Sequence, residues 1–160
     1  MPAAAQLTDF SKRERPPRGH DGPMTDMTVI PKLVVDGADA AIDFYRRALG
    51  AEPLVRHTGD DGRVVYAEFR VGGSVLSIKD ADAHDPAARG LFTLDVADAD
   101  TVWAALEEAG ATVVFPLGDQ PYGMRQGRVA DPFGNQWIVS QQTEDLSPDQ
   151  VQQRLDAGTG

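Results

Sequence analysis

The pattern of apolar and polar positions occurs twice along the chain, in the same order. Each copy opens with an apolar strand pattern, at 28–35 and at 91–96. A helical pattern follows at 38–49 and at 98–109, with apolar residues spaced i, i+3, i+4 and i+7. A Gly-Ala pair ends each helical pattern, first at Gly50 and again at Gly110. The chain is therefore predicted to contain two copies of one unit, packed together because each alone buries its apolar face poorly.

Three further strands follow each predicted helix. They span 52–58, 63–71 and 74–79 in the first copy, and 111–116, 127–130 and 136–141 in the second. Asp36 is placed to cap the first helix, and glycine-containing turns lead into the last strand of each copy. The order β-α-β-β-β in each copy predicts an α+β fold, with a ligand cleft between the copies.

The predicted domain is flanked by two short terminal segments. Its parts are module one at 27–80, a linker at 81–89 and module two at 90–142, which together make a domain of 27–142. Residues 1–26 are polar, proline-bearing and aperiodic, so we expect a flexible tail. In the remaining segment, 143–160, Ser147 and Pro148 predict the start of a short helix outside the repeat.

Composition excludes several classes of function. The 160 residues carry 25 acidic and 15 basic side chains, a formal charge of −10 without a basic stripe, so neither nucleic acid nor an anionic membrane surface is an expected partner. There is no cysteine, which excludes disulfides, thiolate nucleophiles and Cys-ligated metals. No apolar run approaches the roughly 20 residues of a membrane span. We expect a cytoplasmic protein without a cofactor.

Two motifs carry a resemblance to a known superfamily. AIDFYRRALGAEP in the first helix and RVADPFGNQW in the last hairpin are similar to segments of vicinal oxygen chelate proteins. That group contains glyoxalase I, extradiol dioxygenases, and bleomycin- and fosfomycin-resistance proteins, and the PhnB-like branch is the most similar. The resemblance covers 28–142. It implies two tandem βαβββ modules whose curved mixed sheet surrounds a cup, the glyoxalase/bleomycin-resistance fold, and it implies a homodimer.

Enzymes of that superfamily hold one divalent metal in the cup, on the first and fourth strands of each module. The resemblance transfers these positions to Ile30 and Ser77 in module one, and to Leu91 and Ile138 in module two. The placement is consistent, because Leu91 follows Ile30 at the same offset as Ile138 follows Ser77. Three of the four are hydrocarbon side chains, and a lone serine hydroxyl is a poor ligand for a divalent ion. We therefore expect no metal at the family position.

Strand alternation selects the side chains that face the cup. If Val65, Ala67 and Phe69 lie under the helix, Tyr66 and Glu68 face the other way. This pair is the candidate for catalysis, with Glu68 as general base beside a phenol. The alternative is that Glu68 pairs with a base such as Lys32 or Arg70. The candidate ligand-binding residues are Lys32, Tyr66, Glu68, Ser77, Thr93, Tyr122, Arg125 and Gln136.

Tyr122 and Arg125 belong to a predicted long loop, LGDQPYGMRQG, over the mouth of the cup. Arg125 there either grips a carboxylate or phosphate of a ligand, or forms a structural ion pair with Asp131 or Asp119. Both alternatives are open at this point. The remaining large aromatic residues are expected in the core: Phe44, Tyr45, Trp103 and Trp137.

Three functions are compatible with this pattern. The first is a metal-free protein that binds a small organic molecule in the cup, such as an antibiotic or metabolite that it sequesters. The second is a glyoxalase-like lyase or isomerase that uses a displaced metal or Glu68 acid-base chemistry. The third is a structural or regulatory module with a filled cup. An open cavity of a few hundred cubic ångströms favours the first two.

Overall fold

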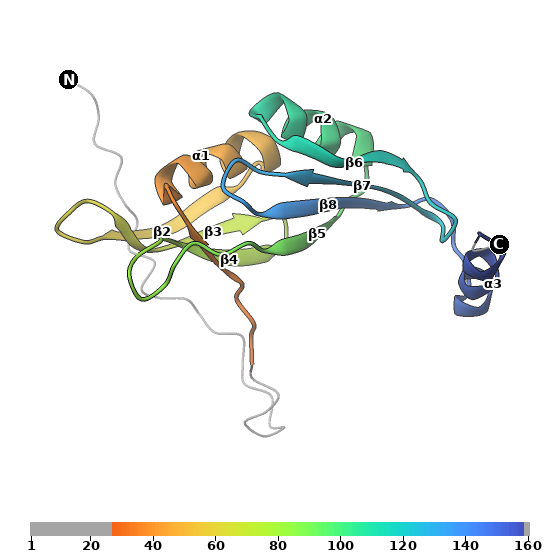
Figure 1. The fold of residues 1–160 in the computed structure, drawn as a ribbon, viewed down its shortest axis with the longest axis horizontal. Helices are drawn as coiled ribbons and strands as arrows, with labels where there is room; N and C mark the ends of the chain where they lie inside the picture. Colours follow the sequence, from red (N-terminus) through yellow and green to blue (C-terminus); the bar gives the residue numbers. More distant parts are fainter. Residues whose placement is uncertain (1–26, 159–160) are drawn as a thin grey trace.

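The computed structural model describes residues 27–158, which form the two predicted modules and a C-terminal helix (Figure 1). Module one contains β1 (Lys32–Val35), α1 (Ala38–Leu49), β2 (Glu52–Thr58), β3 (Val64–Val71) and β4 (Ser74–Asp80). Module two contains β5 (Leu91–Asp95), α2 (Ala99–Ala109), β6 (Thr112–Asp119), β7 (Met124–Ala130) and β8 (Gln136–Gln142), and α3 (Pro148–Gly158) follows. The predicted α+β class with tandem βαβββ modules is confirmed. The expected tail at 1–26 lies outside the described residues.

Each module builds its own four-stranded mixed sheet. The strand orders are β1-β4-β3-β2 and β5-β8-β7-β6, so the first strand of each module lies beside its last. That pair is parallel and the other neighbours are antiparallel. Because the crossover between the parallel strands contains the helix, one face of each sheet is covered. We call the opposite face of each sheet its open face.

The two main helices end at the predicted glycines, but a different residue caps the start of α1. Gly50 and Gly110 adopt the left-handed conformation at the two C-caps, with φ of 63° and 110°. Asp36 was expected to cap α1, and this prediction is wrong. The carboxylate of Asp80, at the end of β4, instead accepts from the backbone N–H groups of Gly37 and Ala38 at 3.1 and 2.8 Å. A residue distant in sequence thus supplies the cap.

Both helices pack into one hydrophobic core that the modules share. α1 contacts α2, and each helix also contacts strands of its own sheet. The predicted core aromatics are confirmed, since Phe44, Tyr45, Trp103 and Trp137 are all at most 9% exposed. Because the helix-covered faces meet at this core, the open faces of both sheets turn away from it. In Figure 1 the helices lie side by side on the same side of the two sheets.

A buried aspartate joins the two modules. Asp131, in the turn before β8, accepts hydrogen bonds from the Tyr45 hydroxyl of α1 at 2.6 Å and from Trp137 Nε1 at 2.9 Å. Its other oxygen accepts from the backbone N–H groups of Phe133 and Asn135. Burial, and then the nearby carboxylate, raises the pKa of the Tyr45 phenol well above its ordinary value of 10. The DPFGN motif therefore acts as a structural joint.

Three strand predictions need correction. β1 begins at Lys32 rather than at 28, and the loop expected at 117–127 is largely strand because β6 and β7 continue to pair as far as Asp119 and Arg125. Val65 was expected under the helix but is 52% exposed, whereas Val64 is buried. The β2–β3 register shifts between His57 and Thr58, and this irregularity exchanges the two valines.

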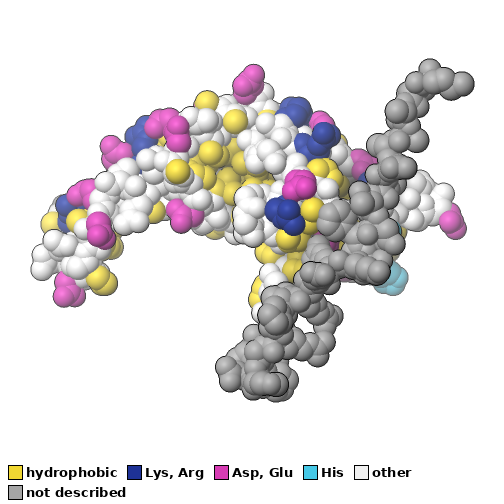
Figure 2. All heavy atoms as spheres, turned by 180° about the vertical axis from the view of Figure 1, so that it is seen from behind, with side chains coloured by type: hydrophobic (Ala, Val, Ile, Leu, Met, Phe, Trp, Pro, Cys, Tyr) yellow, Lys and Arg dark blue, Asp and Glu magenta, His cyan; other side chains and the backbone are white. Residues whose placement is uncertain are grey.

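The outer surface carries apolar side chains near its middle. Seen from behind the view of Figure 1, hydrophobic side chains gather around the middle of the molecule, with charged side chains beside them and along the edges (Figure 2). α3 lies at the far end of the molecule, where Arg154 pairs with Glu144 at 2.8 and 2.9 Å. Within residues 27–158 no helix is both long enough and apolar enough to span a membrane.

Candidate ligand site

The open face of module one carries a polar group of side chains centred on Glu68. Lys32 lies opposite Ser77 in the register of β1 and β4, and Ser77 lies opposite Glu68 in β3. The Tyr66 hydroxyl donates to Glu68 Oε1 at 2.6 Å, and Lys32 Nζ lies 5.3 Å from the centre of the Tyr66 ring. His57 stacks on the same ring from β2, with 6.4 Å between ring centres. Four predicted site residues are thus brought together.

The open face of module two carries a chain of neutral hydrogen bonds. Tyr122 donates its hydroxyl to Gln126 Oε1 at 2.7 Å, and Gln126 Nε2 donates to Ser140 Oγ at 2.8 Å. The three residues come from the β6–β7 turn, β7 and β8, so this chain fixes the turn against the sheet. Of the predicted loop residues, Tyr122 therefore does reach the open face.

Arg128 lies beside this chain, on the same face of β7. In the strand register it pairs with Phe115 of β6 on one side and Ile138 of β8 on the other. Its guanidinium carbon lies 5.3 Å from the centre of the Phe115 ring, a cation–π distance. One terminal nitrogen contacts Gln136 Oε1 at a long 3.4 Å, and the buried Nε has no hydrogen-bond partner among the described residues.

Arg128, Phe115 and Ile138 line a pocket of about 230 Å³ on the open face of module two. Phe115, Pro116 and Ile138 supply apolar walls, and the polar lining comes from module two as well. The polar lining residues are Gln120, Tyr122, Gln126 and Arg128. The pocket thus combines an apolar lining with one cationic group, the composition of a site for a small organic molecule.

A second, larger cavity lies on the other side of the sheets, between the modules. Its volume is about 650 Å³, and most of its lining is hydrophobic, from the end of α1, the β3–β4 turn, β5 and α2. Leu49 and Val71 line it from module one, and Leu94 and Val102 from module two. Thr93, a predicted ligand residue, borders this cleft. Apart from Asp95 at its edge, the lining is uncharged.

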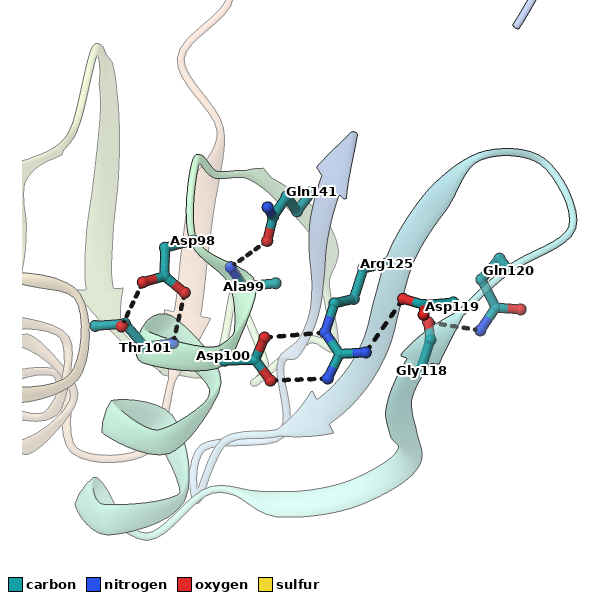
Figure 3. Close-up of polar contacts among 9 residues, drawn as sticks. All are labelled: Asp98, Ala99, Asp100, Thr101, Gly118, Asp119, Gln120, Arg125 and Gln141. Carbon is teal, nitrogen blue, oxygen red and sulfur yellow. Dashed lines mark hydrogen bonds and ion pairs between the residues drawn. The ribbon is translucent and has the colours of Figure 1, made fainter. Parts of the chain in front are cut away.

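Arg125 does not reach the open face. It lies in β7 and points to α2, where its Nε and Nη2 donate to the carboxylate of Asp100 at 3.0 and 2.8 Å (Figure 3). Nη1 donates to Asp119 at 3.1 Å. The hydrogen bonds from Arg125 lower the pKa of Asp100, and the same contacts raise the pKa of Arg125. Of the two alternatives for Arg125, the structure supports the structural ion pair. Its partners are Asp119 and Asp100 rather than Asp131.

The four family metal positions offer no set of ligands. Ser77 donates its hydroxyl to the backbone carbonyl of Pro31 at 3.3 Å, and Ile30, Leu91 and Ile138 have no donor atoms in their side chains. Across the described part of the chain no three His, Cys, Asp or Glu side chains are grouped as a metal would require. A divalent ion does not fit these residues.

Sequence reasoning missed His57, Phe115, Gln126 and Arg128 at these faces. A signal for Arg128 was present, because it follows Glu68 at the same spacing as the second Gly-Ala pair follows the first. Gln126 was concealed by the loop expected at 117–127. Phe115 and His57 both lie next to register shifts in their strands, and alternation alone does not place a residue beyond such a shift.

Comparison with known proteins gives one consistent family. The sequence model of the "Glyoxalase/Bleomycin resistance protein/Dioxygenase superfamily" matches residues 26–139. The uncharacterized protein Rv0887c of Mycobacterium tuberculosis is 38% identical over 133 residues, covering 76% of this chain and 78% of that protein. The uncharacterized protein Mb0911c of Mycobacterium bovis is also 38% identical over 133 residues, covering 76% of this chain and 88% of that protein.

Solved structures agree on the architecture. TioX from Micromonospora sp. ML1 superposes with a TM-score of 0.62 at 25% identity, covering 72% of this chain and 98% of TioX. PA1353 from Pseudomonas aeruginosa gives 0.61 at 24% identity, with 74% and 99% covered. A PhnB protein from Bacillus cereus gives 0.58 at 22% identity, with 72% and 99% covered. At such identities the last two similarities show the fold alone.

Proposed function

Because the chain belongs to the glyoxalase/bleomycin resistance protein/dioxygenase superfamily, we propose that it binds a small organic molecule at the open faces of its sheets, without a resident metal. The observation that carries this proposal is the pocket of about 230 Å³ on module two. Its wall is held in place by the Tyr122–Gln126–Ser140 hydrogen bonds before any ligand arrives. Such preorganisation lowers the entropic cost of binding.

Residue chemistry supports binding without a metal. The family position has three hydrocarbon side chains, and among the described residues Glu68 is the one carboxylate that lies opposite Ser77 on this face of module one. An ion placed against Ile30, Leu91 and Ile138 would lose hydration that these side chains cannot replace. Sequestration of an antibiotic or metabolite fits such a site better than metal-dependent chemistry.

A second chain is proposed to complete the site. Each open face turns away from the core of its own chain, and the pocket is lined by module two alone. On module two, Leu91 on the edge strand β5 is 55% exposed and Phe115 on the edge strand β6 is 58% exposed. Unpaired strand edges of this kind are usually covered. A homodimer would cover them and bring one module's face to another's.

One observation supports an enzyme as the second candidate. The 2.6 Å hydrogen bond from Tyr66 to Glu68 joins a carboxylate to a phenol on the open face of module one. That pair could take a proton from a substrate carbon and return it to a neighbouring one, as an isomerase does. In that case Glu68→Gln abolishes turnover while binding persists, whereas a pure binding protein shows no turnover to lose.

A thermal-shift screen tests the proposal. Metabolites and antibiotics are added to the purified protein, with chelator or with divalent metals. A ligand of the native state at 100 times its Kd adds about 2.7 kcal/mol, which is roughly 5–10 °C for a chain of this size. We expect shifts that the chelator leaves unchanged. If shifts require metal, the metal-free proposal is overturned, and if no compound shifts the midpoint, small-molecule binding is.

A further inference from the structure

We propose that Arg128 recognises a carboxylate, and that the ligand of the module-two pocket is a small aromatic or apolar carboxylate. This inference rests on the proposed small-molecule function and specifies the class of ligand. It concerns the open face of β7, where Arg128 lies between Phe115 and Ile138.

The guanidinium of Arg128 has hydrogen-bonding capacity that its described surroundings leave unused. Its Nε is buried and has no partner within residues 27–158, and the contact of Nη1 with Gln136 is 3.4 Å long. A buried N–H of a charged group without an acceptor costs more than a neutral one, because the lost hydration is not replaced. A small rotation of the guanidinium toward the pocket would expose Nε, and a ligand carboxylate that accepts from Nε and a terminal nitrogen in parallel would then supply the missing bonds.

This arginine differs from the others in the described part of the chain. Six arginines lie within 4.0 Å of an acidic side chain: Arg46, Arg47, Arg56, Arg70, Arg125 and Arg154. Arg63 donates to a backbone carbonyl, and Arg89 is solvent-exposed. In a protein with a net charge of −10, a half-buried arginine with no ion pair to these described residues is available to an anionic ligand.

The pocket walls indicate the rest of the ligand. Phe115 and Pro116 on one side and Ile138 on the other give apolar surfaces, of which the Phe115 ring is flat. The guanidinium already lies over the Phe115 ring, so an aromatic ligand can stack beside it while its carboxylate meets Arg128. The remaining polar lining, Gln120, Tyr122 and Gln126, is uncharged. One guanidinium neutralises one charge, so a monocarboxylate fits better than a dianionic phosphate.

Isothermal titration with a matched set of probes tests this inference. Benzoate and naphthoate are compared with benzamide, benzylamine and phenyl phosphate on the full chain. We expect the carboxylates to bind more tightly than the neutral amide, the amine and the phosphate. Arg128→Gln should weaken carboxylate binding by about 10- to 100-fold, the loss of a charge-assisted pair.

Arg125→Gln is the control variant, because Arg125 is in the same strand and faces α2 instead. It should leave carboxylate affinity unchanged. If Arg128→Gln unfolds the protein, Phe115→Ala should also weaken the carboxylates, and Arg128→Lys should fold and bind less tightly than the native chain. Equal binding of benzoate and benzamide, unchanged affinity in Arg128→Gln, a preference for phenyl phosphate, or no carboxylate binding would each overturn the inference. If instead other compounds shift the midpoint but no carboxylate binds, the inference fails and the proposed function does not.

Discussion

The two modules have the same order of strands and helix, but they carry opposite charges at one corresponding position. Glu68 of β3 pairs with Ser77 of β4, and Arg128 of β7 pairs with Ile138 of β8, at equivalent places of the repeat. Their partners on the outer strands also correspond. Val55 of β2 pairs with Glu68 and Phe115 of β6 pairs with Arg128, and each partner directly follows a register shift in its strand. The repeat thus extends to the first register shift of each outer strand, yet one copy presents an acid and the other a base.

This difference shows that the fold and the site are specified by different residues. The shared core depends on apolar positions and turn glycines that recur in both copies. The open faces do not contribute to that core, so their side chains are free to differ between copies. A dimer that brings a Glu68 face to an Arg128 face would enclose a site with an acidic and a basic side.

The turns before the last strands differ as well. Module one has the short Gly72-Gly73 turn, and module two has the longer DPFGN turn, which carries Asp131 to Tyr45 of the other module. The turn of module two therefore links the two modules. The following predictions test these differences, beginning with the largest effect.

Asp131→Ala is expected to cost about 3 kcal/mol or more, because it leaves the Tyr45 hydroxyl, Trp137 Nε1 and two backbone N–H groups without their acceptor. For a chain of this size the unfolding midpoint should fall by roughly 6–12 °C. The control is Gly73→Ala in the turn of module one, where an added Cβ meets no atom within 4 Å. Its effect should stay within about 0.5 kcal/mol. Similar losses in both variants would contradict the role of Asp131 as a joint.

Leu91→Asp should separate the proposed dimer, because it places a charge on an exposed apolar residue of the edge strand β5. Light scattering is expected to give about twice the chain mass of 17.2 kDa for the native protein and the single mass for the variant. Leu155→Asp, at an exposed apolar position on α3 outside both sheets, is the control and should remain dimeric. A native mass near that of one chain would rule out the shared site.

The Asp100–Arg125 pair should give a small, pH-dependent effect on stability. Arg125 lowers the pKa of Asp100 from its ordinary 3.8, so the ionised pair stabilises the fold above that value. The stabilisation is lost as the pH falls through the lower folded-state pKa. Asp100→Asn should therefore lower the unfolding midpoint by a constant amount above about pH 5. Below about pH 4 the difference between the variant and the native chain should shrink as the pH falls. A difference that persists undiminished at pH 2 would show that the charge of Asp100 is not involved.

Metal removal should have no effect on either module. Elemental analysis after dialysis is expected to find well under one zinc, nickel, manganese or iron per chain. A chelator should leave the unfolding midpoint unchanged, since Ile30, Leu91 and Ile138 have no ligand atoms. One equivalent of metal with a chelator-sensitive midpoint would require a site other than the family position.

Periodicity predicted the fold closely and the site only in part. The bounds of α1 and β2 follow directly from apolar spacing and the turn glycines, because those residues act through local geometry. Asp80 could not be identified as the cap of α1, since the contact is distant in sequence and depends on the β1–β4 pairing. The apolar pattern predicts a loop at Arg125 and so places it over the open face, but continued strand pairing turns it to α2 instead.

A crystal structure with a bound aromatic carboxylate tests the central claim most directly, because it distinguishes the two cavities. We predict that the carboxylate lies within about 2.7–3.2 Å of Arg128 Nε and a terminal nitrogen, with the ring beside Phe115. The rest of the ligand should face Tyr66 and Glu68 of a second chain. A ligand found instead in the cleft beside Leu94 and Val102, with Arg128 unbound, would contradict the account.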